Sequence, residues 1–384
     1  MTYREELSPL KRWVIFALIG ILVFALGCEK KEPIKIGFSA QLTGKQAELG
    51  VQERNGVELA FDEVNKAGGI AGRPIVLVIK DDLGTPAGAI NADKELIAEN
   101  VVCIIGHPTS AQTLAALPTA EAGKTILMSP TTSTSALSGK DDGFFRIIQS
   151  LVDRARGLAE YVFKVQKAQK LTVIYDSENQ AYVQSFWVQF SNRYKELGGA
   201  VVAEKAFSSS KEDVDFDKLV ADARASQADA LLIVAADTDT ALIAQRVRIG
   251  GWNVPLYTSE WAQTDVLLKN GGNAVEGMVY EQSIAMGSKG KAFTDFKNAF
   301  TARYGREPAF GAVFGYETAK VLAKALEQSK GNKEGLKQGL LGIKDFQGLV
   351  DKMSIDQYGD VIRPYYLGKI EKGVFVDMDP KILK

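Results

Sequence analysis

The sequence predicts an α/β protein in which two lobes, each built on a doubly wound parallel sheet, are joined by crossing strands. Short apolar runs rich in β-branched residues alternate along the chain with segments of helical periodicity, which is typical of a parallel sheet covered by helices. This alternation begins at residue 34, ends near residue 149 and then starts again, so we expect two sheets. The roughly 350 residues that follow the N-terminal segment are also enough for about two domains.

The first block opens with an expected strand at 34–38, and a helix from Val57 to Val64 follows with apolar residues at helical spacing. Gly68, just beyond this helix, is typical of a helix end because glycine adopts positive φ easily. Further strands are expected at 75–79, 101–105 and 125–128, and further helices at 87–99 and 111–122.

The second block repeats the alternation. Strands are expected at 171–175, 200–205, 230–235 and 256–259, and helices at 152–165, 182–197, 216–225 and 240–249. Beyond Gly277 we expect a strand, two helices at 293–304 and 316–328, and a hairpin at 356–360, because Gly359 can take positive φ at its turn.

These blocks predict the division of the chain into lobes. We expect residues 34–149 and 277–354 in the first lobe and residues 150–276 and 355–384 in the second. No low-complexity linker separates the blocks, so short crossing segments are expected to join them.

The N-terminus has the layout of a bacterial secretory signal. Lys11 and Arg12 precede an apolar run at 13–26, and charged residues follow it directly. The run is shorter than the ~20 residues that a spanning helix needs. We therefore expect residues 1–27 to be a signal peptide and the remainder to lie outside the cytoplasm.

Residues 24–28 resemble a lipobox, in which small residues precede a cysteine that receives lipid. Cys28 is accordingly the expected lipid attachment site, and residues 28–33 the tether. Ala25 stands where leucine is more usual. The alternative is an uncleaved membrane anchor in which Cys28 is an apolar bystander.

Composition excludes several function classes. The formal net charge is −1 with no basic block, which argues against a nucleic-acid partner. With Cys28 lipidated, Cys103 has no partner for an intramolecular disulfide. His107 is the one histidine and no G-x-S-x-G motif accompanies it, so neither a serine hydrolase nor a His/Cys metal site can be assembled. We expect no enzyme activity, no metal and no cofactor.

Several segments, in order and at matching spacing, resemble the leucine/isoleucine/valine-binding protein family. They are residues 34–44, 55–60, 65–70, 81–82, 105–107, 126–130, 175–176, 315–317 and 356–360. The resemblance implies a type I periplasmic binding fold whose two lobes close on a ligand held in the cleft between them. It also implies delivery of that ligand to the membrane permease of an ABC importer.

The resemblance assigns first-lobe ligand contacts to hydroxyl residues. Ser110 matches the serine that binds the ligand carboxylate, and the start of a helix suits an anion. Thr131 and Ser133 match the segment that holds carboxylate and ammonium together. Taken without the resemblance, this Ser/Thr cluster is also consistent with a plain turn whose hydroxyls bond their own backbone.

The second lobe is expected to supply an aromatic lid and a carboxylate. Tyr182 matches the lid, with a spacing one residue longer than usual, and Glu260 matches the carboxylate that neutralises the ligand ammonium. The alternative for Glu260 is a solvated loop residue. Related proteins often carry aromatic residues near the positions of Leu49 and Asp237. We therefore expect these two residues to contact the ligand and to affect the shape of the pocket.

The family also often has a first-lobe disulfide. Gly84 and Thr109 occupy the matching positions here, so that disulfide is absent.

The leading hypothesis is therefore a lipid-anchored receptor for an aliphatic or branched-chain amino acid. The alternative is the same fold binding an aromatic or other small carboxylate, or an amide, for uptake or sensing. Glu260 separates the two, because a carboxylate aimed at the ligand favours a cation. The lipobox, and a chain that ends at Lys384 with no output domain, favour transport over sensing.

Lipidation can be tested directly. If Cys28 is acylated and residues 1–27 are removed, the mature protein should partition into membranes, and Cys28→Ala should alter processing and release the protein. Mass spectrometry of the native N-terminus measures this. An unmodified Cys28 within an intact leader would contradict the prediction.

Overall fold

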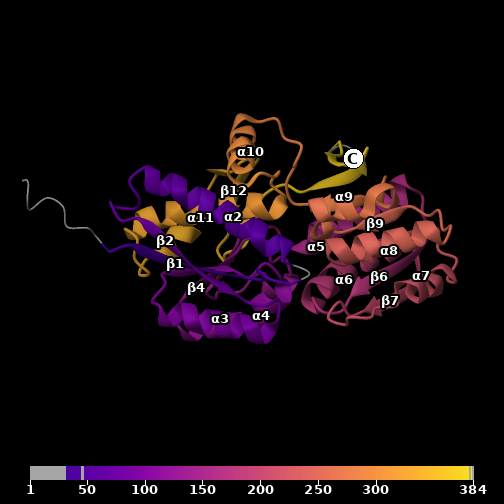
Figure 1. Cartoon of the computed structure of the whole chain (residues 1–384), viewed down its shortest axis with the longest axis horizontal. Coiled ribbons are helices and arrows are strands. Elements are labelled where there is room, and N and C mark those ends of the chain that lie inside the picture. Colours follow the sequence, from indigo (N-terminus) through magenta and orange to yellow (C-terminus); the bar gives the residue numbers. More distant parts are fainter. Residues whose placement is uncertain (1–31, 45–46, 380–381, 383–384) are drawn as a thin grey trace, which may run out of the picture.

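The computed structural model describes residues 32–44, 47–379 and 382. The described chain forms two α/β lobes that lie side by side along the long axis of the molecule (Figure 1), as the sequence predicts. The predicted signal peptide, Cys28 and the tether up to residue 31 lie outside the described residues. None of the described helices combines the length and apolar character that crossing a bilayer requires.

The first lobe is built on a five-stranded sheet in the order β2-β1-β3-β4-β5, with every neighbouring pair parallel. Its strands are β1 (Ile34–Ala40), β2 (Ile75–Asp81), β3 (Cys103–Gly106), β4 (Ile126–Ser129) and β5 (Phe144–Arg146). Ile34, Ile36 and Phe38 are fully buried because helices cover both faces of the sheet.

Helices from distant parts of the chain cover the two faces of this sheet. One face packs against α2 (Glu48–Lys66), α11 (Phe310–Ser329) and α12 (Leu336–Leu341), and the other against α3 (Pro86–Ala98) and α4 (Ser110–Ala122). Helices α2 and α11 lie side by side (Figure 1). Gly56 and Gly315 allow this approach, since a Cβ at either position would overlap the backbone of the facing helix.

The second lobe is built on a seven-stranded sheet in the order β15-β14-β10-β9-β8-β6-β7. The strands are β6 (Lys170–Asp176), β7 (Ala200–Phe207), β8 (Ala230–Val234), β9 (Leu256–Thr258), β10 (Val279–Gln282), β14 (Tyr366–Glu371) and β15 (Val374–Asp377). Strands β6 to β10 pair in parallel, and β14 and β15 add an antiparallel edge.

Helices also cover both faces of the second sheet. Helices α5 (Leu151–Glu160) and α6 (Gln180–Glu196) pack on one face, and α7 (Phe216–Arg224), α8 (Asp237–Ile249) and α9 (Asp265–Gly271) pack on the other. Helix α10 (Lys291–Tyr304) lies against α2 and α11 of the first lobe. A small sheet of β11 (Phe346–Gln347), β12 (Lys352–Ile355) and β13 (Val361–Ile362) completes the described strands.

The crossings between lobes differ from the predicted division at residues 277 and 355. Strand β10 pairs with β9 in the second sheet, although residues 277–354 are predicted to belong to the first lobe. Strand β13 pairs with β12, and Val361 packs in the first-lobe core, although the second lobe is predicted to resume at residue 355. The reason is that these short buried strands carry no sequence mark of the sheet they join.

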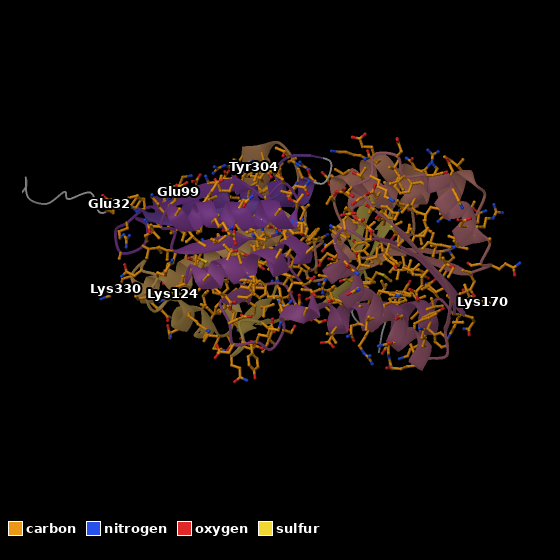
Figure 2. All side chains as sticks on the ribbon, turned by 90° about the horizontal axis from the view of Figure 1, so that it is seen from below. Glu32, Glu99, Lys124, Lys170, Tyr304 and Lys330 are labelled. Carbon is orange, nitrogen blue, oxygen red and sulfur yellow. The ribbon has the colours of Figure 1, made fainter. Side chains whose placement is uncertain are left out.

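The carboxyl ends of both sheets point toward the opposite lobe. Glu99 and Lys124 precede β3 and β4, and Lys170 begins β6. Figure 2 places Glu99 and Lys124 at the outer end of one lobe and Lys170 at the outer end of the other, so the amino ends of the strands lie away from the centre. The loops that follow the strands therefore meet between the lobes, where open α/β sheets bind ligands.

Candidate functional site

A cavity between the lobes contains about 320 Å³ of empty space, including the part that is open to solvent. Its first-lobe wall comes from the loops after β3 and β4, and its second-lobe wall from α5, α6 and the turn η3 (Glu260–Ala262). Six of the seven predicted ligand residues line it: Leu49, Ser110, Thr131, Ser133, Tyr182 and Glu260. The structure thus brings together residues that lie up to about two hundred positions apart in the sequence.

The seventh predicted residue, Asp237, lines an adjacent cavity of about 460 Å³ that shares Leu49 and Trp261 with the first. Its carboxylate accepts a hydrogen bond of 2.6 Å from the hydroxyl of Thr264. Burial raises the pKa of Asp237, and the hydrogen bond from Thr264 partly opposes this. Its side chain is therefore held by its own lobe beside the cavity.

Two buried hydroxyls face the cavity from the first lobe. Ser110 is the first residue of α4 and Ser133 follows β4, and each is 1% exposed. Neither Oγ has a hydrogen-bond partner among the described residues. Since buried polar atoms are normally paired, these hydroxyls are suited to a polar group of a ligand.

Thr131 lies in the same wall but uses its hydroxyl within the protein. Its Oγ1 contacts Glu53 on α2 and donates to the carbonyl of Pro108 at 2.7 Å. Burial raises the pKa of Glu53 well above its ordinary value, against the lowering effect of its contact with the hydroxyl of Thr131. The side chain of Thr131 thus joins the loops after β3 and β4 to α2.

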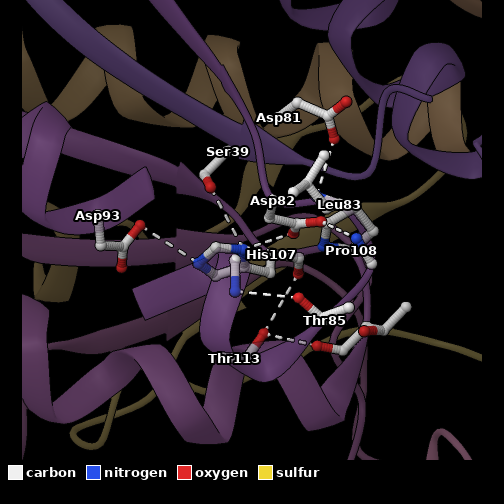
Figure 3. A network of polar contacts seen from close by, with 12 residues as sticks. Ser39, Asp81, Asp82, Leu83, Thr85, Asp93, His107, Pro108 and Thr113 are labelled. Atoms are coloured by element: carbon white, nitrogen blue, oxygen red, sulfur yellow. Dashed lines mark hydrogen bonds and ion pairs between the residues drawn. The ribbon is translucent and has the colours of Figure 1, made fainter. Parts of the chain in front are cut away.

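The loop that carries Ser110 is fixed by a buried ionic network around His107 (Figure 3). Its Nδ1 lies 2.7 Å from Asp82, its Nε2 lies 3.2 Å from Asp93, and all three side chains are buried. Burial by itself would lower the pKa of His107, but the contacts with Asp82 and Asp93 outweigh it and raise the pKa to about 9. His107 is therefore a cation held between two carboxylates.

The backbone of His107 is fixed as well. Its carbonyl accepts hydrogen bonds from Ser129 at 2.7 Å and from Thr132 at 3.0 Å. These bonds join the loop after β3 to the loop after β4, so the positions of Ser110 and Ser133 depend on one another. Asp82 and Asp93 are remote from His107 in sequence, so the sequence alone does not identify this network.

Glu260 projects from the second lobe into the cavity wall. The resemblance implies a carboxylate that is free to meet the ligand, but this carboxylate already has partners within the protein. Oε2 lies 2.7 Å from Arg154 and accepts from the hydroxyl of Ser283 at 2.6 Å, and Oε1 accepts from the backbone N–H of Ser283 at 2.7 Å. Arg154 also contacts Glu281, whose Oε2 lies 2.5 Å from the same Nη1. We refer to Arg154, Glu260, Glu281 and Ser283 as the Arg154 cluster.

The aromatic part of the second-lobe wall contains a residue that the sequence analysis missed. The rings of Tyr182 and Trp261 meet edge to face with centroids 5.4 Å apart. Trp261 directly follows Glu260, so the rule that ligands meet loops after parallel strands could have identified it. Arg154 could also have been identified from the sequence. It lies next to Ala155 and four residues before Leu158, on the side of α5 that is buried.

The lobes contact each other beside the cavity. The side chain of Asn179, from the second lobe, accepts a hydrogen bond of 3.2 Å from the backbone N–H of Ala111 near the start of α4. The hydroxyl groups of Thr134 and Ser185 lie 2.7 Å apart across the same boundary. The described arrangement therefore has both walls close enough to touch one small molecule at once.

The chain is similar in sequence to known proteins. The sequence model of a family described as periplasmic binding protein matches residues 33–374. The Leu/Ile/Val-binding protein homolog 3 of Brucella melitensis biotype 1 is 23% identical over 350 residues, which cover 90% of this chain and 94% of that protein.

Two solved structures are similar over almost their whole length. The leucine-binding protein from Thermotoga maritima has a TM-score of 0.83 and 25% identity, covering 90% of this chain and 98% of that one. A solute-binding protein of an ABC transporter from R. palustris, in complex with benzoate, has a TM-score of 0.81 and 19% identity, covering 90% and 95%. These likenesses confirm the predicted fold class.

The His107 network predicts how stability depends on pH. Because the folded pKa of His107, about 9, lies above its ordinary value, the network stabilises the fold fully below about pH 6.5 and loses this effect as pH rises through about 9. We expect the free energy of unfolding to fall by about 2 kcal/mol between about pH 7.5 and about pH 9.5. Urea unfolding at both values measures this.

The matched variant is His107→Gln, which cannot be charged. Its stability should change less over the same interval, and no other histidine in the chain can obscure the comparison. Equal pH dependence in the wild type and the variant would contradict the assignment of a charged His107.

Proposed function

Because the chain belongs to the periplasmic binding protein family, we propose that it is the extracytoplasmic receptor of an ABC importer and binds an aliphatic or branched-chain amino acid between its lobes. The names of the Brucella relative and the Thermotoga neighbour support this ligand class. The relatives found are solute-binding proteins rather than enzymes, and their family is extracytoplasmic. Lipid anchoring through Cys28 and delivery of the ligand to a membrane permease are parts of the same proposal.

The observation that carries the proposal is the difference in charge between the two walls. The first-lobe wall offers the hydroxyl of Ser110 at the start of α4, a helix of 13 residues, and the hydroxyl of Ser133 in the loop after β4. The amino end of a helix favours a negative group. The second-lobe wall offers Glu260, which shares Arg154 with a second carboxylate. A zwitterion placed between the walls would meet a suitable partner at each end.

The rest of the cavity suits an apolar side chain. Leu49 and Phe310 line it from the first-lobe helices, Ile148 lies at the crossing after β5, and Trp261 closes the second-lobe side. Ile148 and Phe310 are each at most 3% exposed. These apolar walls suit an aliphatic side chain better than a long polar one.

A second candidate ligand is a small carboxylate without an amine. Arg154 lines the cavity, and a guanidinium binds carboxylates well. The R. palustris neighbour of the same fold was solved with benzoate. Against this candidate, the guanidinium of Arg154 is already shared by two glutamates, so a simple anion would approach a net negative wall.

The proposal is tested by titration calorimetry with leucine and with 4-methylpentanoate, which has the same carbon skeleton but no amine. We expect wild type to bind leucine more tightly. Ser110→Ala removes a hydrogen bond to a charged group and should weaken both compounds by about 1.5–3 kcal/mol. Glu260→Gln should weaken leucine by on the order of 2–5 kcal/mol while leaving 4-methylpentanoate unchanged or better bound.

Thr294→Ala, which removes an exposed hydroxyl from the first turn of α10, is the control and should bind both compounds as wild type does. If 4-methylpentanoate binds wild type as tightly as leucine, and Glu260→Gln changes neither affinity, the carboxylate ligand replaces the amino acid.

A further inference from the structure

The Arg154 cluster has more negative than positive charge. One guanidinium contacts two carboxylates, and Arg154, Glu260 and Glu281 are 1%, 2% and 0% exposed at their side chains. The other contacts are neutral: Ser283 donates to Glu260, and the backbone N–H of Glu260 donates to Glu281 at 3.1 Å. Hydrogen bonds stabilise the carboxylates without cancelling charge, so the fully ionised cluster has a net charge of −1.

The neighbouring elements do not supply the missing positive charge. Helix α6 contributes Tyr182, whose pKa is raised by burial, and β14 places Leu367 opposite Glu281. Across the lobe boundary, Arg146 on β5 is engaged by Asp360 at 2.7 Å. Among the described residues packed around the cluster, Arg154 is thus the cation that both glutamates share.

Only one of the two glutamates reaches the cavity. Glu260 lines it, whereas Glu281 lies on β10 behind Glu260 and is fully buried. If Arg154 faced Glu260 alone, the pair would be neutral and the cavity would have no preference for a cation. The contact of Arg154 with Glu281 is what leaves Glu260 with uncompensated charge.

From this geometry we propose that Glu281 determines the charge selectivity of the site: by sharing Arg154 with Glu260 from behind the wall, it leaves one negative charge that a ligand ammonium group neutralises. The inference rests on the proposed function and names the residue that separates its two candidate ligands. Glu281 does not touch the ligand and acts as a positioning residue through Arg154 and Glu260.

A proton can neutralise the charge of the Arg154 cluster in place of the ligand ammonium group. Burial, with a smaller contribution from the charge of Glu260, raises the pKa of Glu281 to about 7 against the attraction of Arg154. Because Glu281 and Glu260 share one guanidinium, a proton taken up by this pair as the pH falls leaves the cluster neutral. A ligand that brings a positive charge stabilises the ionised form, so its binding releases this proton, and its affinity should rise with pH until the glutamate is ionised.

The test compares leucine with 4-methylpentanoate against wild type, Glu281→Gln and Glu281→Asp. Calorimetry at about pH 6, 7 and 8, in two buffers of different ionisation heat, gives affinity and the number of protons released. Wild type should prefer leucine about tenfold or more, release a proton on binding leucine near about pH 6, and bind 4-methylpentanoate with no release.

Glu281→Gln should lose most of the preference for leucine and release no proton, whereas Glu281→Asp should retain both properties in part because it keeps the charge. Glu317→Gln is the matched control. Glu317 is another glutamate that is 1% exposed and paired with an arginine, Arg363, at 2.6 Å, but it lies outside the cavity wall. Any general effect of removing a buried charge should change both affinities equally and leave their ratio intact.

The outcomes separate this inference from the proposed function. If wild type prefers leucine, and Glu281→Gln keeps both the preference and the proton release, Glu281 has only a structural role and the inference is overturned alone. If wild type binds neither compound, the proposed ligand class is overturned and the inference with it. If Glu281→Gln fails to fold, Glu281→Asp decides: the inference fails if its preference for leucine and its proton release equal those of wild type.

Discussion

The guanidinium of Arg154 has to satisfy two buried carboxylates, and the second wall of the cavity is arranged around this requirement. Removing charges from water is costly, and attraction offsets the cost only when the geometry is good. Arg154 on α5, Glu260 after β9 and Glu281 on β10 are therefore held in fixed relation to one another. Ser283 follows β10 directly, so the cluster also holds the start of the segment that returns to the first lobe.

The first lobe uses a related arrangement for a different purpose. His107 is a buried cation between Asp82 and Asp93, as Arg154 is between Glu260 and Glu281. The His107 network lies behind the loops, and its hydrogen bonds fix the backbone that presents Ser110 and Ser133. One network therefore orients hydroxyl groups toward the cavity, whereas the other sets the charge of the opposite wall. In the proposed function, these two networks would recognise the two ends of a zwitterion by different physical means.

The parallel sheets determine where these networks can act. Loops after parallel strands gather at one edge, and in this protein the two edges face each other. Asn179 and Ser185 make direct contacts across the boundary, so ligand contacts from both walls would add to contacts that already exist between the lobes. A ligand that bridges both walls has a higher affinity for this arrangement than for a separated one, and its binding favours it.

The sequence by itself determined the alternation of strands and helices, the two parallel sheets and most of the positions that meet at the cavity. The resemblance to the family assigned Ser110, Ser133 and Glu260 as ligand contacts, and each follows a predicted strand, whose end is local information. The tertiary structure alone decided that Glu260 is paired with Arg154, that Glu281 stands behind it and that β10 joins the second sheet. These features depend on which distant segments pack together. A buried ion pair is a contact between elements far apart in sequence, so neither periodicity nor residue type at a single position identifies it.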